Sequence, residues 1–177
     1  LISDPALSGS DALSTAKALS AAIKRVEGAD LILTATESSD GYTGTVPEQI
    51  AALLDLPSIT FAKSVEIADG TVKVQRQTEA GYDECESPLP ALVSVTAGVV
   101  EPRYPSFKGI MAAKKKPVEH WGLADLGIDP SLVGLDAAWT AVVSFAKRPP
   151  REKGQIVTDE GDGGTKLAEF LAGQKFL

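Results

Sequence analysis

Residues 89–116 read LPALVSVTAGVVEPRYPSFKGIMAAKKK, and this stretch does most to decide the fold. The apolar run at 91–95 predicts a short strand buried on both faces, as in a parallel sheet. Two prolines then interrupt regular structure. Ser106 is a suitable N-cap for a helix over residues 107–115, whose last turn would carry the lysine run. The stretch therefore predicts a buried strand, an irregular loop and a basic amphipathic helix.

A similar strand, loop and helix are predicted upstream. Residues 31–33 are apolar and indicate a buried strand, and a polar loop with two glycines follows. Thr45 begins a helix that ends near Leu54, and the spacing of Thr45 and Glu48 predicts a capping box. Open α/β sheets bind ligands at the carboxyl ends of their strands, and a helix N-terminus favours an anion. From the residues alone, this loop is either a polar connection or a nucleotide-binding loop.

Two motifs carry a resemblance to a known family. The tetrapeptide EPRY at 101–104, followed by IM at 110–111 and the lysine run, resembles the signature of the electron transfer flavoprotein beta subunit. Upstream, DLIL at 30–33 leads into ESSDG at 37–41 and resembles the nucleotide-binding loop of the same family. The resemblance is to the carboxyl-terminal two thirds of a bacterial, actinobacterial-like version, so we expect an amino-terminal third to be absent here.

The resemblance implies which residues form each site. In this family the loop holds AMP in ordinary carriers and a second FAD in bifurcating ones. The expected nucleotide contacts form one continuous segment: Ala35, Thr36, Glu37, Ser38, Ser39, Asp40, Gly41, Tyr42, Thr43, Gly44, Thr45 and Val46. The common family pattern has amides and a longer acidic run at 41–45, where this chain differs. The expected contacts with a partner dehydrogenase are Glu101, Arg103, Tyr104, Phe107, Ile110 and Met111, with Phe107 as the apolar anchor.

The resemblance also implies a fold and a function. The fold would be α/β and Rossmann-like, of the adenine nucleotide alpha hydrolase-like type, with a mostly parallel sheet. The function would be that of the beta subunit of a heterodimeric carrier, which takes electrons from acyl-CoA and related dehydrogenases to a quinone oxidoreductase. AMP would lie in this subunit and FAD mainly in the alpha subunit, so this chain alone would not be an enzyme. The alternatives are a bifurcating electron transfer flavoprotein with FAD in this site and a stand-alone adenine-nucleotide-binding module.

Local patterns predict the remaining organisation. Residues 10–26 have helical periodicity, with Ser10 as the N-cap. A β-hairpin is predicted from two strands, 58–67 and 71–77, on either side of the Asp69-Gly70 turn. A second turn at Ala80-Gly81 and a further strand over 82–86 would extend this antiparallel excursion. We predict a nucleotide-binding domain at 1–146 and a carboxyl-terminal arm at 147–177. The arm has a charged, proline-rich linker at 147–154 and a terminal helix at 165–176, and we expect it to dock on the alpha subunit.

Composition excludes several other classes. The net charge of −7 argues against a nucleic-acid partner. No apolar run approaches the roughly 20 residues of a membrane span, so no membrane insertion is expected. Cys85 is the only cysteine and His120 the only histidine, which excludes an intrachain disulfide and a histidine-rich metal cluster. We expect a cytoplasmic protein in a bacterium, or a mitochondrial matrix protein in a eukaryote.

Overall fold

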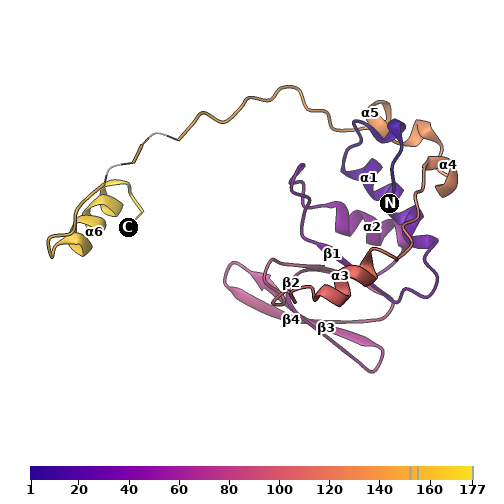
Figure 1. The fold of residues 1–177 in the computed structure, drawn as a ribbon, viewed down its shortest axis with the longest axis horizontal. Coiled ribbons are helices and arrows are strands. Elements are labelled where there is room, and N and C mark those ends of the chain that lie inside the picture. The colour runs from indigo at the N-terminus through magenta and orange to yellow at the C-terminus, as the bar shows by residue number, and fades with distance from the viewer. Residues whose placement is uncertain (152, 155, 177) are drawn as a thin grey trace. The chain divides into compact units, whose positions relative to one another are not determined.

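The computed structural model describes residues 1–151, 153–154 and 156–176 (Figure 1). The chain divides into two compact units, Leu1–Ala141 and Val142–Leu177. The predicted domain boundary at 146/147 therefore falls inside the second unit. The helices are α1 (Ala12–Lys24), α2 (Val46–Leu54), α3 (Phe107–Ala113), α4 (Leu123–Leu126), α5 (Gly134–Ala137) and α6 (Gly163–Gly173), with 3-10 turns η1 (Pro5–Leu7) and η2 (Pro130–Leu132).

The first unit contains a five-stranded mixed sheet. Its strands are β1 (Leu31–Ala35), β2 (Ser58–Ala68), β3 (Thr71–Thr78), β4 (Gly81–Pro88) and β5 (Ala91–Val95), in the spatial order β1-β5-β2-β3-β4. The β1–β5 and β5–β2 pairs are parallel, whereas the β2–β3 and β3–β4 pairs are antiparallel. The predicted α/β class and the predicted antiparallel excursion are therefore confirmed.

The hairpin between β2 and β3 turns at the predicted dipeptide. Asp69 and Gly70 both have positive φ, 51° and 74°, which is the backbone geometry of a tight two-residue hairpin loop. The next connection lies at residues 79–80, and β4 begins at Gly81. The turn predicted at Ala80-Gly81 is thus displaced by one residue, because Gly81 belongs to the strand and pairs with Thr78.

Strand β2 has a bulge where its two pairings meet. Ser58, Ile59 and Ala62 pair in parallel with β5, and Ala62 also begins the antiparallel pairing with β3. Phe61, at the bulge, has a φ of 58°, which is uncommon for a bulky side chain. Its N–H donates to Ser94 Oγ at 3.2 Å, so a side chain of β5 supports the irregular backbone of β2.

Two hydrophobic clusters hold the first unit together. One joins the helices to the sheet through Ala16 of α1, Ile50 and Ala51 of α2, and Leu92 of β5. In Figure 1 both helices lie on the same side of the sheet. The other cluster consists of strand residues alone, including Val72, Val74 and Val93, and is thus made by the sheet itself. Strand β5 contributes to both clusters because alternate side chains point to opposite faces.

The ends of two helices differ from the sequence prediction. Asp11, not Ser10, is the N-cap of α1, because its Oδ1 accepts from Ser14 N at 2.9 Å. The hydroxyl of Ser10 instead accepts from Gly134 N at 2.9 Å. Ser106 is the N-cap of α3 as predicted, but the helix ends at Ala113. The lysine run therefore lies beyond the last helical turn.

Residues 121–140 pack back onto the start of the chain. Asp4 Oδ2 accepts from Leu123 N at 3.0 Å, and Asp11 Oδ2 accepts from Trp139 N at 2.8 Å. Gly134, with a φ of 75°, approaches so closely that an added Cβ would lie 2.3 Å from the carbonyl oxygen of Ala6. Backbone hydrogen bonds, first from Ser14, hold the pKa of Asp11 below its usual range.

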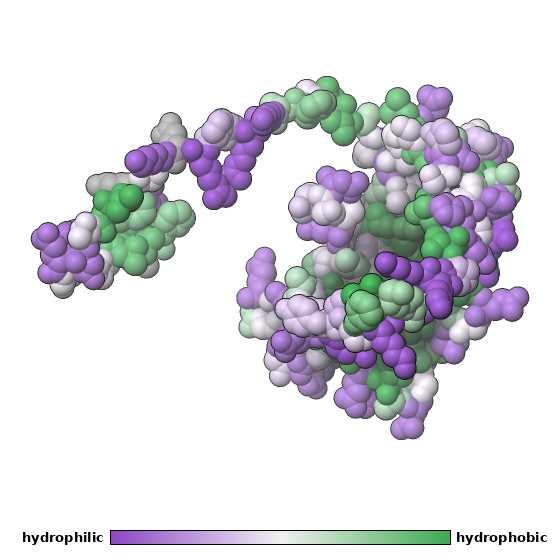
Figure 2. Space-filling model, viewed as in Figure 1, coloured by the Kyte–Doolittle hydropathy of each residue, from purple (hydrophilic) through white to green (hydrophobic). Residues whose placement is uncertain are grey.

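The second unit has a short helix, and none of the described residues between 142 and 162 lies in a helix or strand. The terminal helix predicted at 165–176 is α6, Gly163–Gly173. Its start is fixed by Asp159, whose Oδ1 accepts from the N–H groups of Gly161 and Gly163 at 2.8 Å. Figure 2 shows hydrophobic side chains on α6, and Leu167 and Phe170 are more than half exposed. Glu152, in the predicted linker at 147–154, lies outside the described residues.

We predict that Asp11→Ala lowers the free energy of unfolding by about 1–2 kcal/mol, because it removes an N-cap and an acceptor for Trp139 N. Asp11→Asn should cost less, since Asn also caps helices. Because the folded pKa of Asp11 is lowered, its contribution is present above the unfolded pKa of about 3.9 and is lost as pH falls through the folded value. Urea unfolding at neutral pH and at acid pH tests this. A deficit of Asp11→Ala that is equal at both pH values would contradict it.

Candidate functional site

The predicted nucleotide loop lies at the carboxyl end of β1. The strand ends at Ala35, and the loop runs through residues 36–45 to the start of α2. Thr36, its first residue, donates from Oγ1 to the carbonyl oxygen of Val95 at 3.1 Å. The loop thus follows a strand of the parallel part of the sheet, at the edge where α/β sheets bind ligands.

Short-range hydrogen bonds shape the loop. Gly41 N donates to Asp40 Oδ1 at 2.7 Å, and Tyr42 N donates to the Ser38 carbonyl oxygen at 3.2 Å. Hydrogen bonds from the Ser38 hydroxyl and then from Gly41 N–H hold the pKa of Asp40 below its usual range. Gly44 has a φ of 65°, and a Cβ there would lie 3.7 Å from Glu37 Oε2. Asp40 and Glu37 therefore present carboxylate oxygens on an exposed, tightly bent loop.

The capping box predicted at the start of α2 is wrong. Thr45 makes no side-chain capping bond, because its ψ of −6° departs from the extended backbone of a capping residue. Its Oγ1 accepts instead from Gln49 Nε2 at 3.4 Å. Pro47 has no N–H, so the helix start offers the uncapped N–H groups of Val46 and Glu48.

The loop and helix start fit a phosphorylated nucleotide. Uncapped N–H groups at a helix N-terminus favour an anion such as a phosphate. The carboxylates of Glu37 and Asp40 can accept hydrogen bonds from ribose hydroxyls. In the first turns of α2, Glu48 Oε2 and Gln49 Oε1 are buried acceptors without a hydrogen-bond partner within the described part of the chain. The structure therefore brings donors for an anion and acceptors for a sugar into one loop–helix junction.

The predicted docking segment, residues 101–111, follows β5. Val99 N donates to the Thr96 carbonyl oxygen at 3.3 Å, and irregular chain then leads to α3. Ser106 Oγ accepts from Gly109 N at 3.1 Å and so begins the helix. Tyr104 is 95% exposed and Phe107 81% exposed, while Ile110 and Met111 are partly covered but also reach the surface. These apolar side chains lie where no described residue buries them.

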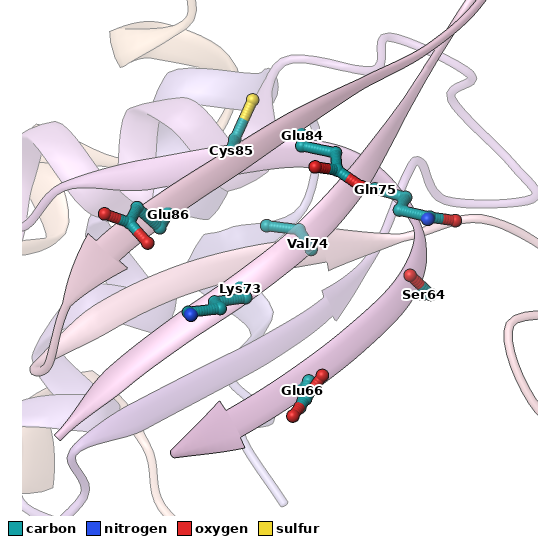
Figure 3. Close-up of a pocket in the computed structure, with 8 residues that line it drawn as sticks. All are labelled: Ser64, Glu66, Lys73, Val74, Gln75, Glu84, Cys85 and Glu86. Carbon is teal, nitrogen blue, oxygen red and sulfur yellow. The ribbon is translucent and has the colours of Figure 1, made fainter. Parts of the chain in front are cut away.

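A polar depression forms a separate feature on β2, β3 and β4 (Figure 3). Glu66, Lys73 and Glu86 are neighbours in register across the three strands, and Ser64, Gln75 and Glu84 form the next row. Cys85 and Val74 point to the other face, where they pack in the strand cluster. Cys85 is therefore a sheet residue, as predicted, and the depression has the character of a solvated sheet face.

Sequence reasoning missed the hydroxyl groups at the ends of the strands. Thr36 Oγ1 donates to the Val95 carbonyl oxygen, and Ser94 Oγ accepts from Phe61 N. Thr96 Oγ1 donates to the Ala62 carbonyl oxygen at 3.3 Å. The available signal was a Ser or Thr at the end of each predicted parallel strand, namely Thr34 and Thr36, and Ser94 and Thr96. The hydroxyls of Thr36, Ser94 and Thr96 tie the parallel strands together at the edge where the loop begins.

Comparison with known proteins identifies the family. A family model described as "Electron transfer flavoprotein domain" matches residues 1–126, which includes the loop, the sheet and the docking segment. This chain belongs to the electron transfer flavoprotein family. The predicted resemblance is therefore confirmed at the level of the family.

Several curated relatives of this electron transfer flavoprotein chain are beta subunits. Those of Mycobacterium bovis and Mycobacterium leprae are 41% and 40% identical over 176 residues, which is 99% of this chain and 66% of each relative. The "Caffeyl-CoA reductase-Etf complex subunit CarD" of Acetobacterium woodii is 37% identical over 158 residues, 89% of this chain and 60% of that protein. The chain thus spans about two thirds of the length of the mycobacterial relatives that it matches.

Two other kinds of site are absent from the described residues. The described residues contain no group of three or more His, Cys, Asp or Glu side chains arranged to hold a metal ion. Within the same residues, no helix has both the length and the apolar character needed to cross a membrane. The loop–helix junction and the docking segment are therefore the two candidate functional surfaces.

Proposed function

We propose that this chain acts as the beta subunit of a heterodimeric electron transfer flavoprotein. It would accept electrons from acyl-CoA and related dehydrogenases and pass them to a quinone oxidoreductase, in the cytoplasm of a bacterium. The observation that carries the proposal is the match of the electron transfer flavoprotein domain over residues 1–126, which contains both candidate surfaces. Within the Rossmann-like folds, we assign the first unit to the adenine nucleotide alpha hydrolase-like group.

In this proposal the chain binds AMP, while FAD is held mainly by the alpha subunit. The N–H groups at the start of α2 would hold the phosphate, and Glu37 and Asp40 would accept from the ribose. Flavin, when bound, supplies the redox chemistry. This chain's own residues would hold the nucleotide, orient the partner and exclude water from the contact, so the subunit needs no catalytic residue of its own.

The experiment that tests the proposal is purification of the complete complex followed by mass spectrometry of the released nucleotides. One AMP and one FAD per complex would support it. Two FAD molecules would instead assign a flavin to the loop of this chain, and a monomer with an adenine nucleotide and no flavin would indicate a stand-alone binding module.

We predict that Asp40→Lys and Gly44→Val each reduce the nucleotide retained by the complex. Lysine would break the hydrogen bonds that shape the loop, and valine is strained at a φ of 65°. Glu79→Lys and Gly70→Val are matched controls, because they repeat the charge change and the strain in the β-turns of the antiparallel strands. Nucleotide content per complex is the measurement. Normal content in both loop variants would reject the assignment.

We predict that Phe107→Ala weakens docking to the dehydrogenase about thirtyfold, because buried interface anchors cost about 2 kcal/mol or more when truncated. The stability of the chain should not change, since the side chain is exposed in the unbound subunit. Val118→Ala, an exposed apolar residue beyond α3, is the control. The dehydrogenase-coupled reduction rate measures docking. An unchanged rate in Phe107→Ala, or a loss of folding stability, would contradict the anchor role.

We predict that truncation after Phe145 impairs assembly with the alpha subunit more than it impairs folding. The truncation removes α6, and the exposed side chains of Leu167 and Phe170 would each gain roughly 1.5–3 kcal/mol if a partner covered them fully. In the isolated chain, amides of the second unit should exchange quickly, because short helices are marginal in water. Size-exclusion chromatography of the truncated chain with its partner is the test, with Glu169→Gln in the full chain as control. An equally tight truncated complex would overturn the prediction.

A further inference from the structure

The two candidate surfaces are attached to neighbouring points on β5. The nucleotide loop is fastened at its first residue, because Thr36 Oγ1 donates to the carbonyl oxygen of Val95 at 3.1 Å. Val95 is the last residue of β5 and is also the register partner of Ala35 in β1. The chain that leads to the docking segment begins at the next residue, Thr96. A single peptide unit therefore separates the anchor of the loop from the root of the docking segment.

The root of the docking segment is held on its other side by β2. Thr96 N and Thr96 Oγ1 both donate to the Ala62 carbonyl oxygen, at 2.9 and 3.3 Å. Ser94, which is 1% exposed, accepts from Phe61 N. Beyond the turn at Val99, no backbone N–H group of residues 100–106 donates a hydrogen bond to a backbone carbonyl oxygen among the described residues. The order of this stretch therefore depends on how firmly its root is held.

We propose that Thr36 is a positioning residue that couples nucleotide binding to the order of the docking segment. The inference rests on the proposed nucleotide site. A nucleotide that restricts the loop also restricts the backbone of Thr36, and the Thr36–Val95 hydrogen bond passes that restriction to the root of the docking segment. When two segments are linked, ordering the first segment lowers the entropic cost of ordering the second. By linkage, docking of the partner also strengthens nucleotide binding by the same factor.

The chain offers closely matched variants for testing this coupling. Thr36→Val removes the hydroxyl and keeps the branched shape, and Thr36→Ser restores the donor. Thr34→Val makes the same chemical change two residues earlier in β1. The Thr34 hydroxyl is buried and has no hydrogen-bond partner within the residues that the structure describes, so its loss breaks no bond.

The experiment is hydrogen–deuterium exchange of the complete heterodimer, with AMP present and with AMP removed. In the wild type, Thr36→Ser and Thr34→Val, AMP should slow exchange in the loop at 37–46 and also in the peptide 96–106, whose hydrogen-bonded amides are those of Thr96 and Val99. In Thr36→Val, AMP should still protect the loop. The Thr36 hydroxyl proton is donated to Val95, and the contacts that we propose for AMP are made by the start of α2 and by Glu37 and Asp40. Residues 96–106 should nevertheless exchange about fivefold faster than in the wild type, the factor expected for one net hydrogen bond.

Two results would overturn the coupling and leave the nucleotide site intact. The first is AMP-dependent protection of 96–106 that survives in Thr36→Val. The second is wild-type protein in which AMP protects the loop and leaves 96–106 unchanged. If AMP fails to protect the loop itself, the proposed nucleotide site is wrong and the coupling falls with it. If Thr36→Val does not assemble, the wild-type comparison with and without AMP decides the question.

Discussion

The parallel pairing of β5 on both of its edges is the interaction on which the rest of the first unit depends. Because β5 lies between β1 and β2, its carboxyl end fixes where the loop after β1 and the bulge in β2 meet. Its side chains also reach both hydrophobic clusters, Leu92 toward the helices and Val93 toward the other strands. A strand of five residues thereby sets the position of the helices, the hairpins and both candidate surfaces.

Much of this arrangement could be predicted from sequence because its signals are local. The apolar run of β5, the Asp69-Gly70 turn and the Ser106 cap each follow from a few adjacent residues, and each was found where the pattern indicated. The order β1-β5-β2 follows from no local pattern, since it requires two strands far apart in sequence to pair. The apolar runs and the family resemblance both indicated parallel strands, and the structure supplied their order and register.

In the candidate site, too, features with local sequence signals were predictable and features set by distant residues were not. The loop and the helix after it were predictable from glycines, hydroxyls and an apolar helix, but the capping box was not, because the ψ of Thr45 depends on how the loop enters the helix. The cap of α1 was misassigned for a related reason, since Ser10 and Asp11 are both capping residues and only the packing of residues 134–139 decides between them. Choices between adjacent polar residues are decided by distant partners, which a sequence window does not contain.

The close approach of Gly134 to Ala6 has a consequence for how this chain tolerates substitution. Backbone meets backbone there, so the space holds a hydrogen atom and no carbon, and the positive φ disfavours every residue that has a side chain. Most buried positions accept some exchange of similar volume. Position 134 has no such alternative, and a comprehensive library of variants should retain one amino acid there although the neighbouring Leu135 is largely exposed and free to vary.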